Sequence, residues 1–134
     1  MVSISTITKL PILLGEYMET DVQKLINAGC IPNCSLAYNG NIEDNTGKFI
    51  TPYVQVSSGT YIVWQPTHAS NRECHMIEYN SSREMVDYWS MNVDGSRTIG
   101  LSSNTAFVRA TFLIGDMNSA RITNESSGAV IWSL

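Results

Sequence analysis

The segment Ala106–Ile114 reads Ala-Phe-Val-Arg-Ala-Thr-Phe-Leu-Ile, and its pattern is that of a β-strand. Successive side chains of a strand point to opposite sides of the sheet, so the segment has two faces. One face carries Val108, Ala110, Phe112 and Ile114, and the other carries Phe107, Arg109, Thr111 and Leu113. Both faces are largely apolar, which is typical of a central strand in packed sheets. A neighbouring subunit covering the second face would explain the pattern equally well.

Similar segments, separated by turn residues, surround this one. We expect strands at about 48–56, 60–65, 74–80, 85–92, 97–101, 106–114, 119–124 and 128–133. Such closely spaced strands with turn chemistry between them indicate a sandwich or barrel. The spacing of a strand–helix–strand unit is absent, which argues against a parallel sheet. The sequence therefore predicts an all-β fold, an antiparallel β-sandwich of jelly-roll type.

Two motifs before the first of these strands predict chain reversals. Asn39-Gly40 is a strong hairpin signal, because Asn and Gly both tolerate a positive φ. Asn45-Thr46-Gly47 has the composition of a second turn.

The first 35 residues follow a different pattern. Thr20-Asp21-Val22-Gln23 resembles a capping box, and Gly29 and Pro32 supply a stop, so we expect a short helix at about 21–28. Val2, Ile4 and Thr6 alternate with polar neighbours and suggest a short strand. The apolar residues of the segment exceed what this strand and a two-turn helix need; they are Ile4, Ile7, Leu10, Ile12, Leu13 and Leu14. Exposed apolar patches usually mark an interface. We therefore expect a docking or oligomerisation segment at 1–35 and a sandwich domain at 36–134.

Composition argues against two classes of partner. The formal net charge is −4, from 8 basic and 12 acidic residues, and the basic residues form no cluster. Nucleic-acid binding needs several Lys or Arg on one face, so we expect none. No run of 18 apolar residues is present, so we expect no membrane insertion.

The chain has three cysteines, Cys30, Cys34 and Cys74. A low and odd number of cysteines does not form a disulfide framework. We expect reduced thiols, although the spacing of Cys30 and Cys34 leaves a small bridge open. A structural zinc site needs a second closely spaced ligand pair, which is missing. We expect no metal and no cofactor.

Catalytic motifs are also missing. The chain has no G-x-S-x-G elbow, and its only histidines are His68 and His75. Glu78 and Asp87 flank a predicted turn and could lie close together, as glycosidase carboxylates do. Acidic pairs of this kind are common on solvated strands, so we expect no enzymatic activity.

The aromatic residues of the predicted hairpin at 75–90 suggest a binding site instead. Tyr88 and Trp89 are adjacent, so one ring faces away from the core if the other faces in. Exposed Tyr and Trp rings stack against the C–H faces of sugars. We expect Trp89 or Tyr88 to be the platform, with polar partners Asp87, Arg83 and Asn80. Alternatively, the outward ring packs beneath the N-terminal segment or a neighbouring subunit.

Three further motifs carry a family resemblance, and they lie at Tyr53–Tyr61 (YVQVSSGTY), Ile77–Val86 (IEYNSSREMV) and Asn104–Arg109 (NTAFVR). They resemble strands and turns of the jelly-roll, carbohydrate-binding-like domain of bacteriophage virion proteins, found in baseplates, tail fibres and head fibres. The similarity covers about residues 37–133. Asn80 stands where that domain usually has Asp, and the first 35 residues have no counterpart in it.

The resemblance implies a virion structural protein: a small fibre, decoration or baseplate component that contacts host-surface glycan. Its partners would be other virion proteins, or itself, bound through the N-terminal segment. It would reside in the virion, and in the host cytoplasm during assembly. Two other classes fit the same motifs, namely a free carbohydrate-binding module or bacterial surface lectin and, less favoured, a small glycan hydrolase.

Overall fold

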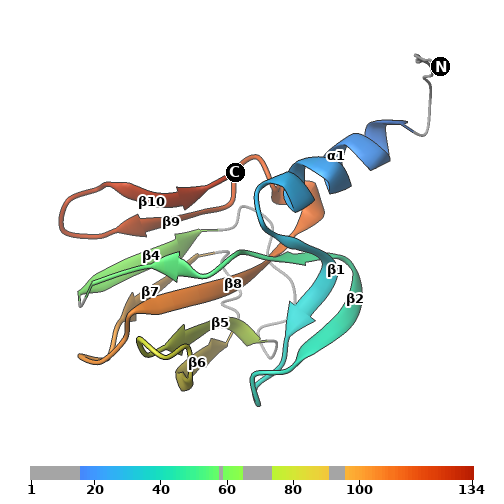
Figure 1. Cartoon of the computed structure of the whole chain (residues 1–134). Coiled ribbons are helices and arrows are strands. Elements are labelled where there is room, and N and C mark those ends of the chain that lie inside the picture. Colours follow the sequence, from blue (N-terminus) through green and yellow to red (C-terminus); the bar gives the residue numbers. More distant parts are fainter. Residues whose placement is uncertain (1–15, 58, 65–73, 91–95) are drawn as a thin grey trace.

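The computed structural model describes residues 16–57, 59–64, 74–90 and 96–134, and its strands form two antiparallel sheets (Figure 1). The elements are α1 (Glu16–Asn27), β1 (Ile31–Leu36), β2 (Ile42–Ile50), β3 (Val54–Gln55), β4 (Thr60–Trp64), β5 (Cys74–Tyr79), β6 (Met85–Ser90), β7 (Ser96–Gly100), β8 (Phe107–Leu113), a 3-10 turn η1 (Ile114–Asp116), β9 (Arg121–Asn124) and β10 (Val130–Ser133). The larger sheet has the order β1-β2-β8-β5-β6, with β3 also paired to β8, and the smaller has the order β10-β9-β4-β7. The predicted antiparallel β-sandwich with a short N-terminal helix is confirmed.

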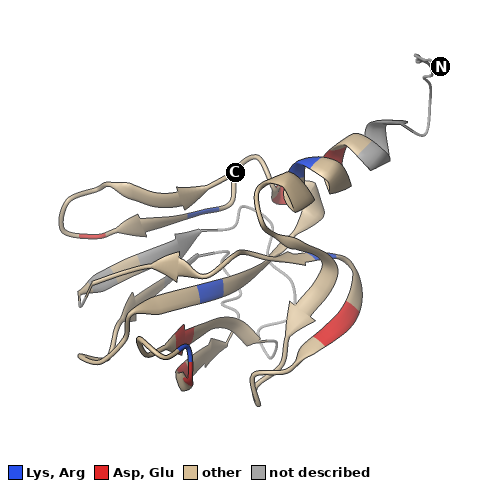
Figure 2. Cartoon of the chain, viewed as in Figure 1, with Lys and Arg blue, Asp and Glu red and all other residues tan. Residues whose placement is uncertain are grey.

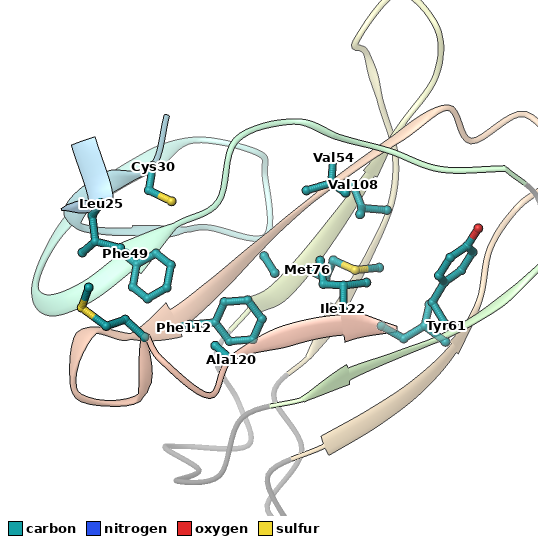
Figure 3. Packing of buried hydrophobic residues seen from close by; sticks show 13 residues of the cluster. Leu25, Cys30, Phe49, Val54, Tyr61, Met76, Val108, Phe112, Ala120 and Ile122 are labelled. Carbon is teal, nitrogen blue, oxygen red and sulfur yellow. The ribbon is translucent and has the colours of Figure 1, made fainter. Parts of the chain in front are cut away.

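β8 lies at the centre of the larger sheet, where it pairs with β2, β3 and β5. Val108, Ala110 and Phe112 are at most 1% exposed and belong to one buried cluster, as the alternation predicts. Figure 3 shows Val108 and Phe112 among the other side chains of this cluster. We call the cluster between the sheets the inner core; it contains Leu25, Cys30, Phe49, Val54, Tyr61, Met76, Ile99, Val108, Ala110, Phe112, Met117, Ala120 and Ile122. Helix α1 and both sheets contribute to it, so it joins the helix to the two sheets.

The opposite face of β8 is covered by the chain itself. Arg109 and Thr111 are buried there. Beside them lies a second cluster, the outer core, with Leu36, Ile50, Cys74, Ile77 and Tyr79 at its centre. The backbone N–H of Leu36 donates to Thr111 Oγ1 at 3.0 Å, although β1 and β8 are not neighbours in the sheet. The β1–β2 hairpin thus curls over this face, and no neighbouring subunit is needed to explain the apolar residues of β8.

The predicted reversal at Asn39-Gly40 is the turn of that hairpin. Gly40 has a φ of 90°, and its N–H donates to the carbonyl of Ala37 at 2.9 Å. Strand β1, in contrast, was not among the predicted strands, because Pro32 and Asn33 are unusual within a strand.

The predicted turn at Asn45-Thr46-Gly47 is wrong, because these residues lie inside β2. They form a bulge opposite Asn33, where the register jumps from Pro32 paired with Phe49 to Cys34 paired with Asp44. Asn33 and Gly47 both have a positive φ, of 55° and 89°. The N–H of Gly47 donates to Asn33 Oδ1 at 3.0 Å. Turn-type residues therefore bend this strand and do not end it.

Helix α1 begins before the expected N-cap. Thr20 lies within the helix, so the predicted capping box is wrong. The predicted stop is confirmed: Gly29 has a φ of 82°, and the N–H of Cys30 donates to the carbonyl of Leu25 at 2.9 Å, as in a Schellman motif. The fully buried side chain of Leu25 anchors the helix in the inner core.

The proposed boundary between residues 35 and 36 falls inside β1, which belongs to the larger sheet. The six apolar residues expected to dock, from Ile4 to Leu14, lie outside the described residues, and their role stays a prediction. In the part of the chain that is described, no helix is long and apolar enough to cross a membrane.

The two faces of β8 predict which alanine substitution lowers the stability of the fold more. Phe112 is fully buried and lies 5.8 Å from the rings of both Phe49 and Trp132, so Phe112→Ala should destabilise by about 3–5 kcal/mol. Phe107 is only half-buried at the margin of the outer core, so Phe107→Ala should cost less. Urea unfolding of both variants tests this, and the reverse order would contradict the facing of β8.

Candidate functional site

The expected aromatic hairpin is formed by β5 and β6, and it points its two adjacent rings to opposite faces of the larger sheet. The register pairs Trp89 with Met76 of the inner core and Tyr88 with Ile77 of the outer core. Trp89 is half-buried against the inner core, whereas Tyr88 is 48% exposed. Tyr88 is therefore the outward ring.

Glu78 holds Trp89 in place. Its side chain has no exposed surface, and its Oε2 accepts a hydrogen bond from Trp89 Nε1 at 2.6 Å. Its Oε1 accepts from Thr105 Oγ1 at 2.6 Å and from the backbone N–H of Ser102 at 2.9 Å. A buried carboxylate needs such donors, because burial without hydrogen bonds is costly.

The acidic pair of the hairpin does not form a cleft. Glu78 lies directly across from Asp87 in the β5–β6 register, as the sequence suggested. However, Glu78 is fully buried and accepts three hydrogen bonds, while Asp87 is exposed. These two carboxylates are therefore not placed to act on either side of a glycosidic bond, as paired glycosidase carboxylates do.

A second tyrosine meets Tyr88 at the surface. Tyr38, in the turn between β1 and β2, is 40% exposed, and its ring centroid lies 4.9 Å from that of Tyr88 at an interplanar angle of 67°. Sequence reasoning missed Tyr38. Its only local signal is an aromatic side chain directly before the Asn39-Gly40 turn, and its contact with β6 arises from the curl of the whole sheet.

The two tyrosines line an open surface depression of about 530 Å³, together with Asp87, Trp89 and Ser90. Asp87 Oδ1 accepts a hydrogen bond from the N–H of Tyr88 at 2.8 Å, which orients the carboxylate. A second depression, of about 300 Å³, shares Tyr38 and is also lined by Ser35, Leu36, Ala37, Glu43, Asn45 and Cys74. Aromatic faces and oriented oxygen atoms thus lie together on one surface.

Asn80 and Arg83, the other two predicted site residues, do not line these depressions. Asn80 Oδ1 accepts from the N–H groups of Ser82 and Glu84, at 2.9 and 3.0 Å, so this side chain shapes the hairpin turn. The guanidinium of Arg83 lies over the ring of Tyr53 at 4.4 Å. Of the five predicted site residues, Asp87, Tyr88 and Trp89 therefore line the first depression, whereas Asn80 and Arg83 lie at the turn of the hairpin.

No protein-family model, no curated protein and no solved structure matches this chain. The resemblance to the phage domain therefore stays a prediction. Among the described residues, no three His, Cys, Asp or Glu side chains are grouped so that they could hold a metal ion.

The three cysteines are free thiols, so Cys30 and Cys34 are not bridged. Burial raises the pKa of Cys30 to about 11 and that of Cys74 to about 12. Since the thiolate is the reactive form, both groups are inert near neutral pH.

Thiol labelling should distinguish the cysteines. At pH 8 the folded protein should show at most one fast-reacting thiol, Cys34, because Cys30 and Cys74 are buried and stay protonated below their raised pKa values. Reaction with a chromogenic disulfide before and after unfolding measures this. Fast reaction of Cys30 or Cys74 in the folded state would contradict the packing described.

Substitution of Glu78 should lower the stability of the fold. Glu78→Gln puts an amide NH₂ among three donors, so at least one loses its acceptor, and we expect a loss of about 1–3 kcal/mol. Glu84→Gln, at an exposed position of the same hairpin, is the matched control and should change stability by less than about 0.5 kcal/mol. Equal urea midpoints for both variants would refute the role of Glu78.

Proposed function

We propose that this protein is a non-catalytic, glycan-binding β-sandwich whose ligand occupies the depression at Tyr38 and Tyr88. One observation carries the proposal: two partly exposed tyrosine rings from separate hairpins touch each other beside an oriented carboxylate. Exposed aromatic pairs with polar neighbours are the usual anchors of small binding surfaces.

The chemistry of the depression suits a saccharide. Tyrosine rings lose little conformational entropy on binding, since each has only two side-chain torsions. The apolar C–H face of a sugar ring can stack on Tyr88, while its hydroxyl groups bond to Asp87 and Ser90. The neighbouring depression, with Glu43 and Asn45, offers further partners for a longer chain.

We also propose that the protein is a component of a phage virion. The support for this role is the resemblance of the three motifs at 53–61, 77–86 and 104–109 to the jelly-roll domain of such proteins. A virion component binds other copies or other proteins of the particle, whereas a free carbohydrate-binding module does not need to. Light scattering of the full chain after size exclusion tests self-association: an oligomer favours the virion role, because a free module predicts a monomer.

Substitution of the two tyrosines tests the glycan site. Tyr88→Ala and Tyr38→Ala should each weaken binding of the best glycan from an array at least about tenfold, because hot-spot aromatics typically contribute that much. Tyr88→Phe keeps the ring and should bind nearly as well as the parent. Val130→Ala, at an exposed position on β10 of the other sheet, is the control for nonspecific effects. If both alanine variants stay folded and bind as the parent does, the site lies elsewhere.

A further inference from the structure

Two arginines share one aromatic ring on the outer face of the larger sheet. The guanidinium carbon of Arg83 lies 4.4 Å from the centroid of Tyr53, and that of Arg109 lies 4.2 Å from the same centroid. Arg83 also lies over Phe107, at 5.1 Å. Two guanidinium groups thus contact the same ring in a chain whose basic positions are few and dispersed (Figure 2).

Arg109 is held rigidly. It is 8% exposed, and both its Nε and its Nη2 donate to the hydroxyl of Tyr79, at 3.1 and 3.0 Å. Burial raises the pKa of Tyr79, and the hydrogen bond and charge of Arg109 oppose that rise. The hydroxyl therefore stays neutral near pH 7 and does not cancel the charge of the guanidinium.

Neither arginine makes an ion pair with a carboxylate of the described residues. The acidic side chains of the neighbouring hairpin are engaged elsewhere: Glu78 with its three donors, Glu84 with Asn80 Nδ2 at 2.9 Å, and Asp87 with the N–H of Tyr88. A guanidinium has five N–H donors in a planar fork, and this fork matches the two oxygens of a carboxylate. The exposed Arg83 therefore offers an unused fork at the surface, whereas the fork of Arg109 is buried and engaged by Tyr79.

The backbone of Arg83 adds to this picture. Its φ is 61°, in the left-handed region where Gly or Asn is the usual choice. An arginine at this turn position is disfavoured by the local conformation, yet its side chain is aimed back over Tyr53 and Phe107. Strained positions of this kind are concentrated at ligand-binding sites.

We propose that Arg83 binds the carboxylate of an acidic sugar, and that the buried Arg109 supports it by holding the Tyr53 ring on which Arg83 stacks. The choice of a sugar rests on the proposed glycan site. Arg83 lies two residues before β6 and stacks on Tyr53 and Phe107, which pack against the outer core, and Tyr88 points to the same face of the sheet. The five residues from Arg83 to Tyr88 span at most about 17 Å of extended chain. An oligosaccharide bound at Tyr88 along this edge strand can thus present an acidic residue to Arg83.

A matched pair of sugars tests the proposal on the full chain. A glucose trisaccharide that ends in glucuronate (the glucuronide) and one that ends in glucose (the glucoside) differ only at C6 of that residue. Titration of each into ¹⁵N-labelled protein follows the Nε–H signal of Arg83 and the backbone signals of Tyr38 and Tyr88. We expect the glucuronide to bind at least about tenfold more tightly, with saturable shifts at Arg83, since hydrogen bonds to charged groups are strong. Arg83→Gln should abolish the difference, and Arg83→Lys, which keeps the charge but not the fork, should reduce it.

Arg121→Gln is the control, because Arg121 lies on β9 of the other sheet, and this variant should retain the preference. Equal affinity of the parent for the two sugars, or a preference that survives Arg83→Gln, overturns the carboxylate site and leaves the tyrosine site standing. If Tyr88→Ala leaves the affinity for both sugars unchanged while the preference for the glucuronide persists, the carboxylate site is supported and the tyrosine site is refuted. Tighter binding of N-acetylglutamate than of the glucuronide assigns the arginines to a protein carboxylate and overturns the acidic sugar. Absence of binding by every probe overturns both sites.

Discussion

The buried carboxylate of Glu78 is the constraint that connects the core of this protein to its surface. Its three donors come from strand β6 and from the loop that precedes β8, so these segments must meet around one side chain. Leaving a charge of this kind without partners would cost several kcal/mol, which is a large share of the stability of a small domain. Because Glu78 draws Trp89 toward the inner core, strand alternation sends the next ring, Tyr88, to the outer face. The position of the proposed glycan site is therefore a consequence of an internal hydrogen-bond network.

Much of the sandwich can be predicted from the sequence, because its strands obey local rules. The alternation of Ala106–Ile114 and the turn residues between segments predict the strands from β4 to β10 closely. The rules fail where tertiary packing overrides them. Asn45-Thr46-Gly47 has the composition of a turn. However, the side chain of Asn33 on the opposite strand accepts a hydrogen bond from the N–H of Gly47, and β2 stays continuous through a bulge. Helix α1 extends beyond its expected N-cap, so the local capping pattern alone did not decide where it begins.

The candidate site was predictable only in part. That one of Tyr88 and Trp89 faces outward follows from the geometry of a strand, but which of them does so depends on the bulges of β5 and β6 and on the burial of Glu78. Tyr38 lies fifty residues from Tyr88 and reaches it only because the larger sheet curls. Asn80 and Arg83 were expected beside the aromatic platform, since they belong to the same hairpin. One of them shapes the turn and the other stacks on Tyr53.

The contact between Tyr38 and Tyr88 joins a hairpin turn to an edge strand, and neither residue belongs to the inner core. Substitutions at such positions usually change stability little, because surface positions tolerate most side chains. The exposed residues Tyr38 and Asn39 of the turn, and Asp87 and Tyr88 of the edge strand, can therefore diverge quickly while the two cores stay constant. This arrangement separates the proposed recognition surface from the residues on which the fold depends, so that side chains at two exposed hairpins can change without a loss of the scaffold.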